Sequence, residues 1–405
     1  MRFDVFLSRN FFAVTFLVLL FVYIESFLWS ETEISLFQKE ENEFGSASVN
    51  ETEISLFQKE NEIGSQNLNE SSGEKEVWGY VLLNLPLGGL GDRFRAAIGG
   101  YYIALLTNRA LKIDGHAMWG SEDDYFDTNT VNWKISEETG QVIRSSNTTR
   151  VEERIGHHDR ERFQELNFDR FKGIDVFVFH TNTIYLNLLA ENPSLRTSPK
   201  FEFFNDLLVK GLARSYALTS LFQPGKKILP YLENFQREYW PTNDTLRIGM
   251  HLRSGDNEKL LSKSRKRRYV VLERAECFAS KAISIWEEKK KGLNEYKNVI
   301  FFVASDLVDL EEIVMKKIES QGFKIFRNNN LGESKHIHLS KADQIRTFVD
   351  WWTLTRMDIL LFSKSGFSES AVHFSLMPSF VYHNNPGPCE AMFKPFDRTT
   401  NMLFF

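Results

Sequence analysis

Cysteine is scarce in this 405-residue chain, which contains only Cys277 and Cys389. Two cysteines are too few to build a disulfide-stapled scaffold. The chain also lacks any Asp-x-Asp sequence, the acidic pair with which many metal-dependent enzymes hold a diphosphate, and it has no cysteine and histidine cluster spaced like a metal site. We therefore expect no metal cofactor, and a bound diphosphate would need cationic side chains and backbone N–H groups.

Acidic and basic residues are unevenly distributed. Residues 30–76 hold 12 glutamates and 3 lysines, whereas the whole chain has a formal net charge of −5, so the remainder is net positive. This mild excess suits a small anionic ligand, but it falls short of the basic stripe that nucleic acid binding needs. We therefore expect no nucleic acid partner.

One long apolar run lies near the N-terminus. Phe11–Ile24 is almost wholly apolar, and the run continues to Trp29, giving about the twenty residues that a bilayer span needs. Arg2 and Arg9 precede it and the acidic segment follows it, which predicts a cytoplasmic tail at 1–10, a signal anchor at 11–29 and a lumenal remainder. A cleaved signal peptide is the alternative, but no small-residue cleavage site follows the run.

Residues 30–76 are polar and poor in apolar side chains, a composition typical of a disordered stem. The string ETEISLFQKE occurs there twice, at 31–40 and 51–60, which fits a tolerated spacer duplication. If this part of the chain is lumenal, four sequons are candidate glycosylation sites, namely Asn50, Asn69, Asn147 and Asn243.

From residue 77 onward, short apolar strands alternate with amphipathic helices, which predicts an α/β fold with mostly parallel sheets. A turn at Gln223-Pro224-Gly225 suggests a boundary between two Rossmann-like, doubly wound domains, 77–225 and 226–405, facing a cleft. Residues 115–170 show little periodicity, and their elements are not assigned. The predicted strands are Val77–Leu85, Ala110–Asp114, Asp175–His180, Leu246–Leu252, Val299–Ala304, Phe323–Phe326, Ile359–Phe362 and Phe380–Tyr382, and helices are predicted at Asp92–Asn108 and Ala342–Met357.

Ligands of open α/β sheets bind at the carboxyl ends of the strands, where this chain places glycines and polar residues. The first such segment is Gly88–Arg93, GGLGDR, between a predicted strand and a helix. Its glycines allow backbone N–H groups to approach a phosphate or sugar at the helix N-terminus. The segment matches neither the dinucleotide-binding nor the P-loop pattern, so a simple tight turn is an equal alternative.

Three further strand ends carry candidate residues. His251 and Arg253 alternate on one strand, so an imidazole and a guanidinium could share a face, although Arg253 could also be a surface partner of Asp256. Ser305-Asp306 could bind a ribose or a guanine edge, or could cap the following helix. The last segment is Ser363–Ser368, whose small residues and hydroxyls could bind an anion at a helix N-terminus, although Ser365 or Ser368 could equally be a helix cap.

Taken in order, these segments resemble the GDP-fucose-dependent α-fucosyltransferase superfamily, which includes plant xyloglucan-type, nodulation-type, N-glycan core and protein O-fucosyltransferases. The resemblance is carried by GGLGDRFRAAIGGYYIALLTNRALKID, IGMHLRSGD, FFVASDLVDLEEI and MDILLFSKSGFSESAVHFS. It spans about residues 80–115 and 246–380 and leaves 115–245 unmatched. It implies a GT-B architecture, an inverting transfer of L-fucose from GDP-fucose to a glycan or glycoprotein in the Golgi or ER lumen, and no required metal.

The resemblance also implies roles for individual residues. Arg253 would bind the β-phosphate beside His251, and Asp306 would read guanosine. Asp256 ends the segment IGMHLRSGD and is counted with the residues that bind the GDP-sugar. Backbone and side-chain groups from Gly89, Gly91, Arg93, Ser365, Gly366, Phe367 and Ser368 would hold the diphosphate and sugar. Asp92 stands where many members have asparagine, so it is expected to turn toward Arg93 or Arg95, or toward the acceptor hydroxyl, and no general base is assigned.

Two other functions fit the same pattern of residues. An enzyme of this fold could use another nucleotide sugar, and a catalytically silent lumenal protein could bind a nucleotide sugar or glycan without turnover. The acceptor should contact the unmatched region 115–245, which carries no motif that identifies it.

Overall fold

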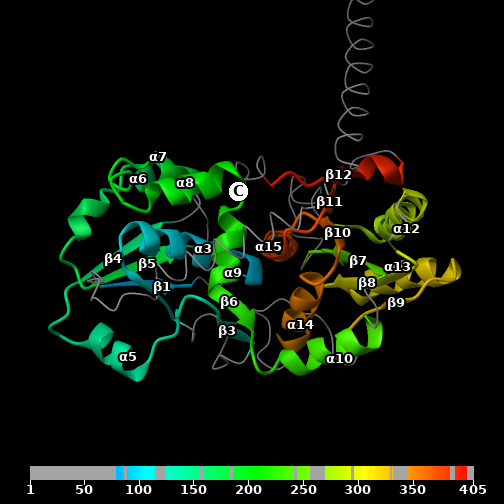
Figure 1. The fold of residues 1–405 in the computed structure, drawn as a ribbon, viewed down its shortest axis with the longest axis horizontal. Helices are drawn as coiled ribbons and strands as arrows, with labels where there is room; N and C mark the ends of the chain where they lie inside the picture. The colour runs from blue at the N-terminus through cyan, green and yellow to red at the C-terminus, as the bar shows by residue number, and fades with distance from the viewer. Residues whose placement is uncertain are drawn as a thin grey trace, which may run out of the picture. The chain divides into compact units, whose positions relative to one another are not determined.

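The computed structural model describes residues 79–398, apart from 86–88, 115–124, 156–158, 182–185, 241–243, 256–269, 293–295, 329–330, 332–343 and 384–387 (Figure 1). All of them belong to one compact unit, Ser71–Phe405. The anchor predicted at 11–29 and the stem predicted at 30–76 lie outside the described residues. Within the described part of the chain, no helix is both long and apolar enough to cross a membrane.

The first half of the unit is built on a four-stranded parallel sheet with the order β2-β1-β5-β4. Its strands are β1 Tyr80–Asn84, β2 Ala110–Ile113, β4 Arg150–Ile155 and β5 Val176–Thr181. The central strands β1 and β5 are largely buried because nearly all of their side chains are apolar. The chain leaves β1 for β2 on one side and reaches β4 on the other, so the topological switch lies between β1 and β5.

The second half contains a six-stranded sheet with the order β12-β11-β10-β7-β8-β9, parallel except for β12. From the centre of the sheet, β7, β8 and β9 follow one another toward one edge, and β10, β11 and β12 follow one another toward the opposite edge. This is the doubly wound arrangement, with its switch point between β7 and β10. The strands are β7 Thr245–Leu252, β8 Asn298–Ser305, β9 Ile325–Phe326, β10 Ile359–Ser363, β11 Ser379–Tyr382 and β12 Phe393–Pro395.

Helices cover both sheets and meet between them (Figure 1). Helices α3, α9 and α15 contact one another, and α14 packs on α15. The helices are α3 Leu90–Leu106, α5 Glu137–Arg144, α6 Arg160–Gln164, α7 Leu186–Glu191, α8 Phe201–Val209, α9 Ala213–Leu221, α10 Leu229–Tyr239, α12 Ala275–Gly292, α13 Val308–Ser320, α14 Gln344–Leu354 and α15 Gly366–Ser375, with 3₁₀ turns at Phe168–Phe171, Leu272–Arg274 and Cys389–Met392.

These elements confirm the predicted α/β class and every predicted strand, with small shifts at the ends. The region 115–170, which showed no clear pattern in the sequence, contains β3 Phe126–Thr128, α5, β4 and α6. Strand β3 pairs with β6 Phe222–Pro224, which occupies the predicted turn at Gln223-Pro224-Gly225. The division into two domains at residue 225 remains a prediction, since both sheets lie in the one compact unit.

Cys277 in α12 and Cys389, which begins a 3₁₀ turn, form a disulfide across a sequence separation of 112 residues. The sequence left open whether they pair. A bridge that closes so long a loop restricts the unfolded chain, so Cys277→Ser should lower the free energy of unfolding by roughly 2–5 kcal/mol. Chemical denaturation should show this loss, and Cys389→Ser should reproduce it. A wild type equally stable with and without reductant would contradict the prediction.

Candidate functional site

The strongest concentration of predicted site residues lies at the switch point of the six-stranded sheet. Arg253 follows β7 directly, and its backbone N–H donates to Ser363 Oγ at 2.7 Å, where Ser363 is the last residue of β10. The same hydroxyl donates to the carbonyl of His251 at 3.3 Å. Ser363 therefore joins the carboxyl ends of the two strands between which such folds bind ligands.

The Arg253 side chain forms an ion pair with Asp306, which follows β8, with an Nη1–Oδ2 distance of 3.1 Å. Asp306 also accepts from the backbone N–H groups of Ser254, at 2.7 Å, and Gly255, at 3.2 Å. The structure thus brings together Arg253 and Asp306, two residues that the sequence placed in the site. Asp306 is not a helix cap, because the N-cap position of α13 is Leu307, whose N–H donates to Ser305 Oγ at 3.1 Å.

His251 lies in the interior at the end of β7. Its ring packs against Phe367 with centroids 4.9 Å apart, and its buried Nδ1 has no hydrogen-bond partner among the residues that the structure describes. Burial lowers the pKa of His251 to about 4, against an opposing effect from Asp306 and together with a further lowering from Arg253. The imidazole is therefore neutral at physiological pH and adds no positive charge to the site.

The buried neutral state of His251 should make stability depend on pH. Its pKa is lower in the folded than in the unfolded chain, so its contribution is present above pH 6.5 and is lost as pH falls toward 4. Asp350, whose pKa burial raises to about 7, acts in the opposite direction, so the test compares wild type with His251→Gln. The stability difference between the two should shift by about 3 kcal/mol in favour of the variant between pH 7 and pH 4.

Urea unfolding at several pH values measures this difference, because Asp350 contributes equally to both proteins and cancels. Parallel stability curves of wild type and His251→Gln would contradict the buried, neutral assignment. His373→Gln serves as a comparison variant, because burial also holds the pKa of His373 well below its ordinary value.

The glycine-rich segment meets the second half of the unit at the first turns of two helices. A Cβ added to Gly91, in the first turn of α3, would lie 2.3 Å from the carbonyl carbon of Gly366 and 2.6 Å from the backbone nitrogen of Phe367. Gly366 begins α15, so the two helix N-termini are in backbone contact. The N-cap of α3 is Gly89, which offers no side-chain cap, and the leading N–H groups of a helix have no partner within it. Two positive helix ends thus converge, an arrangement suited to an anion.

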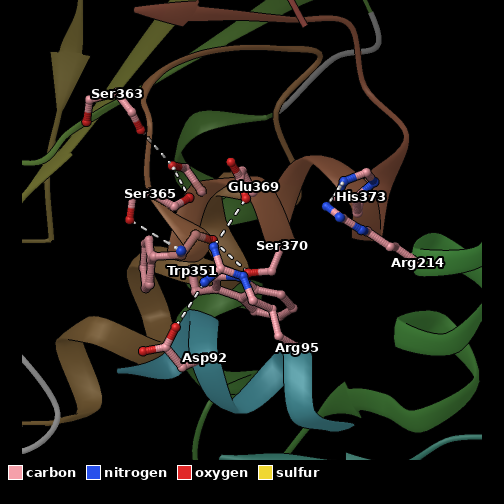
Figure 2. A network of polar contacts seen from close by, with 11 residues as sticks. Asp92, Arg95, Arg214, Trp351, Ser363, Ser365, Glu369, Ser370 and His373 are labelled. Atoms are coloured by element: carbon pink, nitrogen blue, oxygen red, sulfur yellow. Dashed lines mark hydrogen bonds and ion pairs between the residues drawn. The ribbon is translucent and has the colours of Figure 1, made fainter. Parts of the chain in front are cut away.

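An ion-pair chain crosses this junction (Figure 2). Arg95 Nη1 contacts Asp92 Oδ1 at 3.0 Å, and its Nη2 contacts Glu369 Oε2, in α15, at 3.4 Å. Glu369 is buried. Burial of Arg214, in α9, lowers the pKa of that arginine, and the charge of Glu369 opposes this lowering. Arg214 in turn contacts Nε2 of His373 at 3.2 Å. Of the directions expected for Asp92, the structure shows the one toward Arg95.

The serines at the start of α15 already have partners in the backbone. Ser365 is the N-cap, and its Oγ accepts from the N–H of Phe367 at 3.3 Å, as the helix-cap alternative predicted. The Ser368 hydroxyl is buried and donates to the carbonyls of Ser363, at 3.3 Å, and Ser365, at 3.2 Å. Any contact of these hydroxyls with a diphosphate remains a prediction.

The remaining predicted residues fall into three groups. Arg93 is buried in α3, and desolvation lowers its pKa. Asn147 is exposed in the turn before β4, as a glycosylation site requires. Asp256, Asn50, Asn69 and Asn243 lie outside the described residues.

Sequence reasoning missed Glu369 and Arg214 as parts of the site, and it placed Ser363 in a candidate strand-end segment without giving it a role of its own. Ser363 and Glu369 lie within the quoted segment MDILLFSKSGFSESAVHFS, but an isolated glutamate in a helix is usually exposed. Within the described residues, no group of three or more histidine, cysteine, aspartate or glutamate side chains could hold a metal ion. The consecutive acidic residues Glu122, Asp123 and Asp124 lie outside the described residues.

Comparison with known proteins supports the fold. No protein-family model matches the chain, and no curated protein matches its sequence. A solved structure of an Arabidopsis thaliana FUT1 mutant in complex with GDP is 16% identical and superposes with a TM-score of 0.53 over 82% of this chain and 77% of the other. The fucosyltransferase NodZ from Bradyrhizobium is 13% identical, with a TM-score of 0.46 over 79% and 99% of the two chains. The likeness to FUT1 confirms the predicted resemblance at the level of the fold.

Proposed function

We propose that this chain is a glycosyltransferase that transfers L-fucose from GDP-fucose, with inversion, to a glycan or glycoprotein acceptor. The observation that carries the proposal is Arg253, held at the switch point of a doubly wound sheet in a fold shared with a GDP-bound FUT1. A guanidinium can hold a carboxylate on one edge and a phosphate on another, so the pair with Asp306 is compatible with donor binding.

The junction of α3 and α15 supplies the second part of the proposed donor site. As the glycosidic bond breaks, negative charge grows on the β-phosphate of the leaving GDP. The positive ends of α3 and α15 and the guanidinium of Arg253 would stabilise that charge without moving.

The direct experiment is a donor screen. The purified lumenal fragment, residues 77–405, is incubated with labelled GDP-fucose, GDP-mannose and UDP-sugars, and release of the nucleotide is measured with and without candidate glycans or peptides. Turnover of GDP-fucose alone supports the proposal. Turnover of another donor would favour a different nucleotide-sugar enzyme, and GDP binding without turnover would indicate a silent binding protein.

We further propose that the chain is a single-pass type II protein of the Golgi or ER membrane, with its catalytic part in the lumen. The arginines before residues 11–29 and the acidic segment after them support this orientation. The disulfide between Cys277 and Cys389 is in keeping with an oxidising compartment. A C-terminal tag should resist protease in sealed microsomes, and its digestion would reverse the topology.

Donor turnover should survive removal of divalent metal ions. The chain has no Asp-x-Asp pair, and the proposed site neutralises the diphosphate with a guanidinium and helix N-termini instead. Initial rates should therefore agree in excess EDTA and in added manganese. Loss of activity in EDTA with recovery in manganese would point to an acidic site such as Glu122-Asp123-Asp124.

A further inference from the structure

Arg214, in α9, and His373, in α15, point toward each other beside the ion-pair chain of the helix junction (Figure 2). Nη1 of Arg214 lies 3.2 Å from Nε2 of His373. Burial, together with the charges of Arg214 and Arg398, holds the pKa of His373 well below its ordinary value, so the imidazole is neutral. A guanidinium can only donate hydrogen bonds, so Nε2 accepts here and the ring proton lies on Nδ1.

Three buried nitrogen atoms at this place have no hydrogen-bond partner among the residues that the structure describes. They are Nδ1 of His373, Nε of Arg214 and Nε of Arg398. All three atoms are shielded from solvent, and His373 and Arg214 are only 2% and 6% exposed. Each atom carries a proton, and a buried N–H without an acceptor destabilises a fold. Only a species that accepts hydrogen bonds can satisfy these three donors.

Arg398 brings a second guanidinium to the same imidazole from the segment that follows β12. Its Nη2 donates to the carbonyl of Met377, just beyond the end of α15. Phe396, two residues before Arg398, packs its ring against that of His373 with centroids 5.6 Å apart. The neighbouring Asp397 is exposed, so solvent screens its charge. Two guanidiniums from distant parts of the sequence therefore lie within electrostatic reach of one neutral imidazole.

The charges at this place do not balance. The ion-pair chain and the arginines near His373 together contain three guanidiniums, those of Arg95, Arg214 and Arg398, and two carboxylates, those of Asp92 and Glu369. Both carboxylates contact Arg95 directly. In the described part of the chain, neither Arg214 nor Arg398 forms an ion pair with a carboxylate. Buried charges in proteins are normally paired, so one excess positive charge favours the binding of an anion.

We propose that Arg214, His373 and Arg398 form a buried anion-binding site and that its ligand is a small monovalent inorganic anion, chloride. Chloride accepts hydrogen bonds from all three donors and carries the single negative charge that the excess requires. Water would satisfy the donors but leave the charge unpaired, and a divalent anion would reverse the excess. His373 lies seven residues beyond Gly366 along α15, roughly 10 Å at the rise of an α-helix, so this site is separate from the proposed donor site.

Chloride should raise the melting temperature of the full chain purified in detergent. An anion that binds only the folded state stabilises it by mass action, so the midpoint should rise by about 2–5 °C when chloride is in roughly hundredfold excess over its dissociation constant. Sodium gluconate at the same ionic strength and neutral pH is the reference, because gluconate is monovalent but too bulky for a buried site. Bromide should act as chloride does. Equal melting temperatures in chloride and gluconate would overturn the proposal.

Variants locate the effect. Arg398→Gln removes a positive charge at a partly exposed position, and His373→Phe keeps an aromatic ring but removes Nδ1, so each should at least halve the chloride-dependent shift. Arg109→Gln is the matched control, because its guanidinium is equally buried but donates to two backbone carbonyls, at 2.7 and 2.5 Å. It should lower the melting temperature and retain the full chloride shift. A shift undiminished in both Arg398→Gln and His373→Phe would overturn the proposal.

A crystal structure in bromide tests the site without any variant. Anomalous scattering should place a bromide ion in contact with Nδ1 of His373 and with the guanidinium of Arg214 or Arg398. A water molecule at that position, or bromide found only on the protein surface, would overturn the proposal. Neither measurement involves a nucleotide, so failure of the donor screen would leave this anion site in place.

Discussion

Arg253→Ala should lower donor turnover by roughly a hundredfold or more, on the order of 3 kcal/mol of transition-state stabilisation, by analogy with the loss of one preorganised donor. Arg253 lies at the switch point, where its guanidinium is held by Asp306 before any ligand binds. A preorganised cation stabilises the charge that grows on the leaving diphosphate more than it stabilises the ground state. The loss should therefore appear mainly in kcat, measured as release of labelled GDP.

Arg253→Lys should recover little of this activity, because lysine keeps the charge but lacks the planar fork that grips two oxygens. Arg247 offers a matched control on the same strand, since it lies near the amino end of β7 and is also paired with an aspartate, Asp358, at 2.7 Å from its Nε. Arg247→Ala should affect stability but leave kcat near that of wild type. Wild-type activity in Arg253→Ala would show that Arg253 is an ion-pair residue without a catalytic role.

Glu369→Ala should lower the free energy of unfolding by about 3–5 kcal/mol, the range for breaking a buried ion pair by removing one partner. The carboxylate is buried and faces both Arg95 and Arg214, so its loss would remove the charge that opposes the buried Arg214 and one of the two carboxylates that Arg95 contacts. Glu369→Gln keeps the shape and one acceptor oxygen, so it should cost less. Chemical denaturation at neutral pH measures both variants.

Glu312→Ala provides the control for Glu369, because Glu312 is a half-exposed glutamate on a helix surface that forms a long ion pair of 4.0 Å with Arg327. It should change stability by less than about 1 kcal/mol. If Glu369→Ala were as mild as Glu312→Ala, the ion-pair chain across the junction would contribute nothing to holding α3 and α15 together.

The second half of the fold was predictable because its strands are short apolar runs that alternate with helices. Strand β4, RVEERI, was not, since four of its six residues are charged. Glu153 is satisfied there by Arg162, at 2.8 Å in α6, and by Arg170, partners that no local pattern reveals. Strands β3 and β6 were also not predicted, because both are short and they pair across a long separation in the sequence.

The residues of the candidate site likewise include some that the sequence predicts and some that it does not. Arg253, Asp306 and Gly91 follow strands or begin a helix, so a rule about strand ends finds them. The partners that orient them do not follow such a rule. The orientation of Asp306 toward the turn after β7 depends on how separate strands and helices pack, and so does the orientation of Glu369 toward Arg95. The sequence around each of these residues is equally compatible with an exposed side chain.

The contact between Gly91 and Gly366 also has a consequence for the order of folding. The ion pair beside it joins Arg95 and Glu369, which are 274 positions apart, so it can form only after almost the entire α/β unit has been synthesised. Contacts of such long range close late, because the entropy of the intervening chain opposes them until the local structure is complete. The proposed donor site is consequently among the last features to form during folding, and a chain truncated before α15 would lack it however well its first sheet had folded.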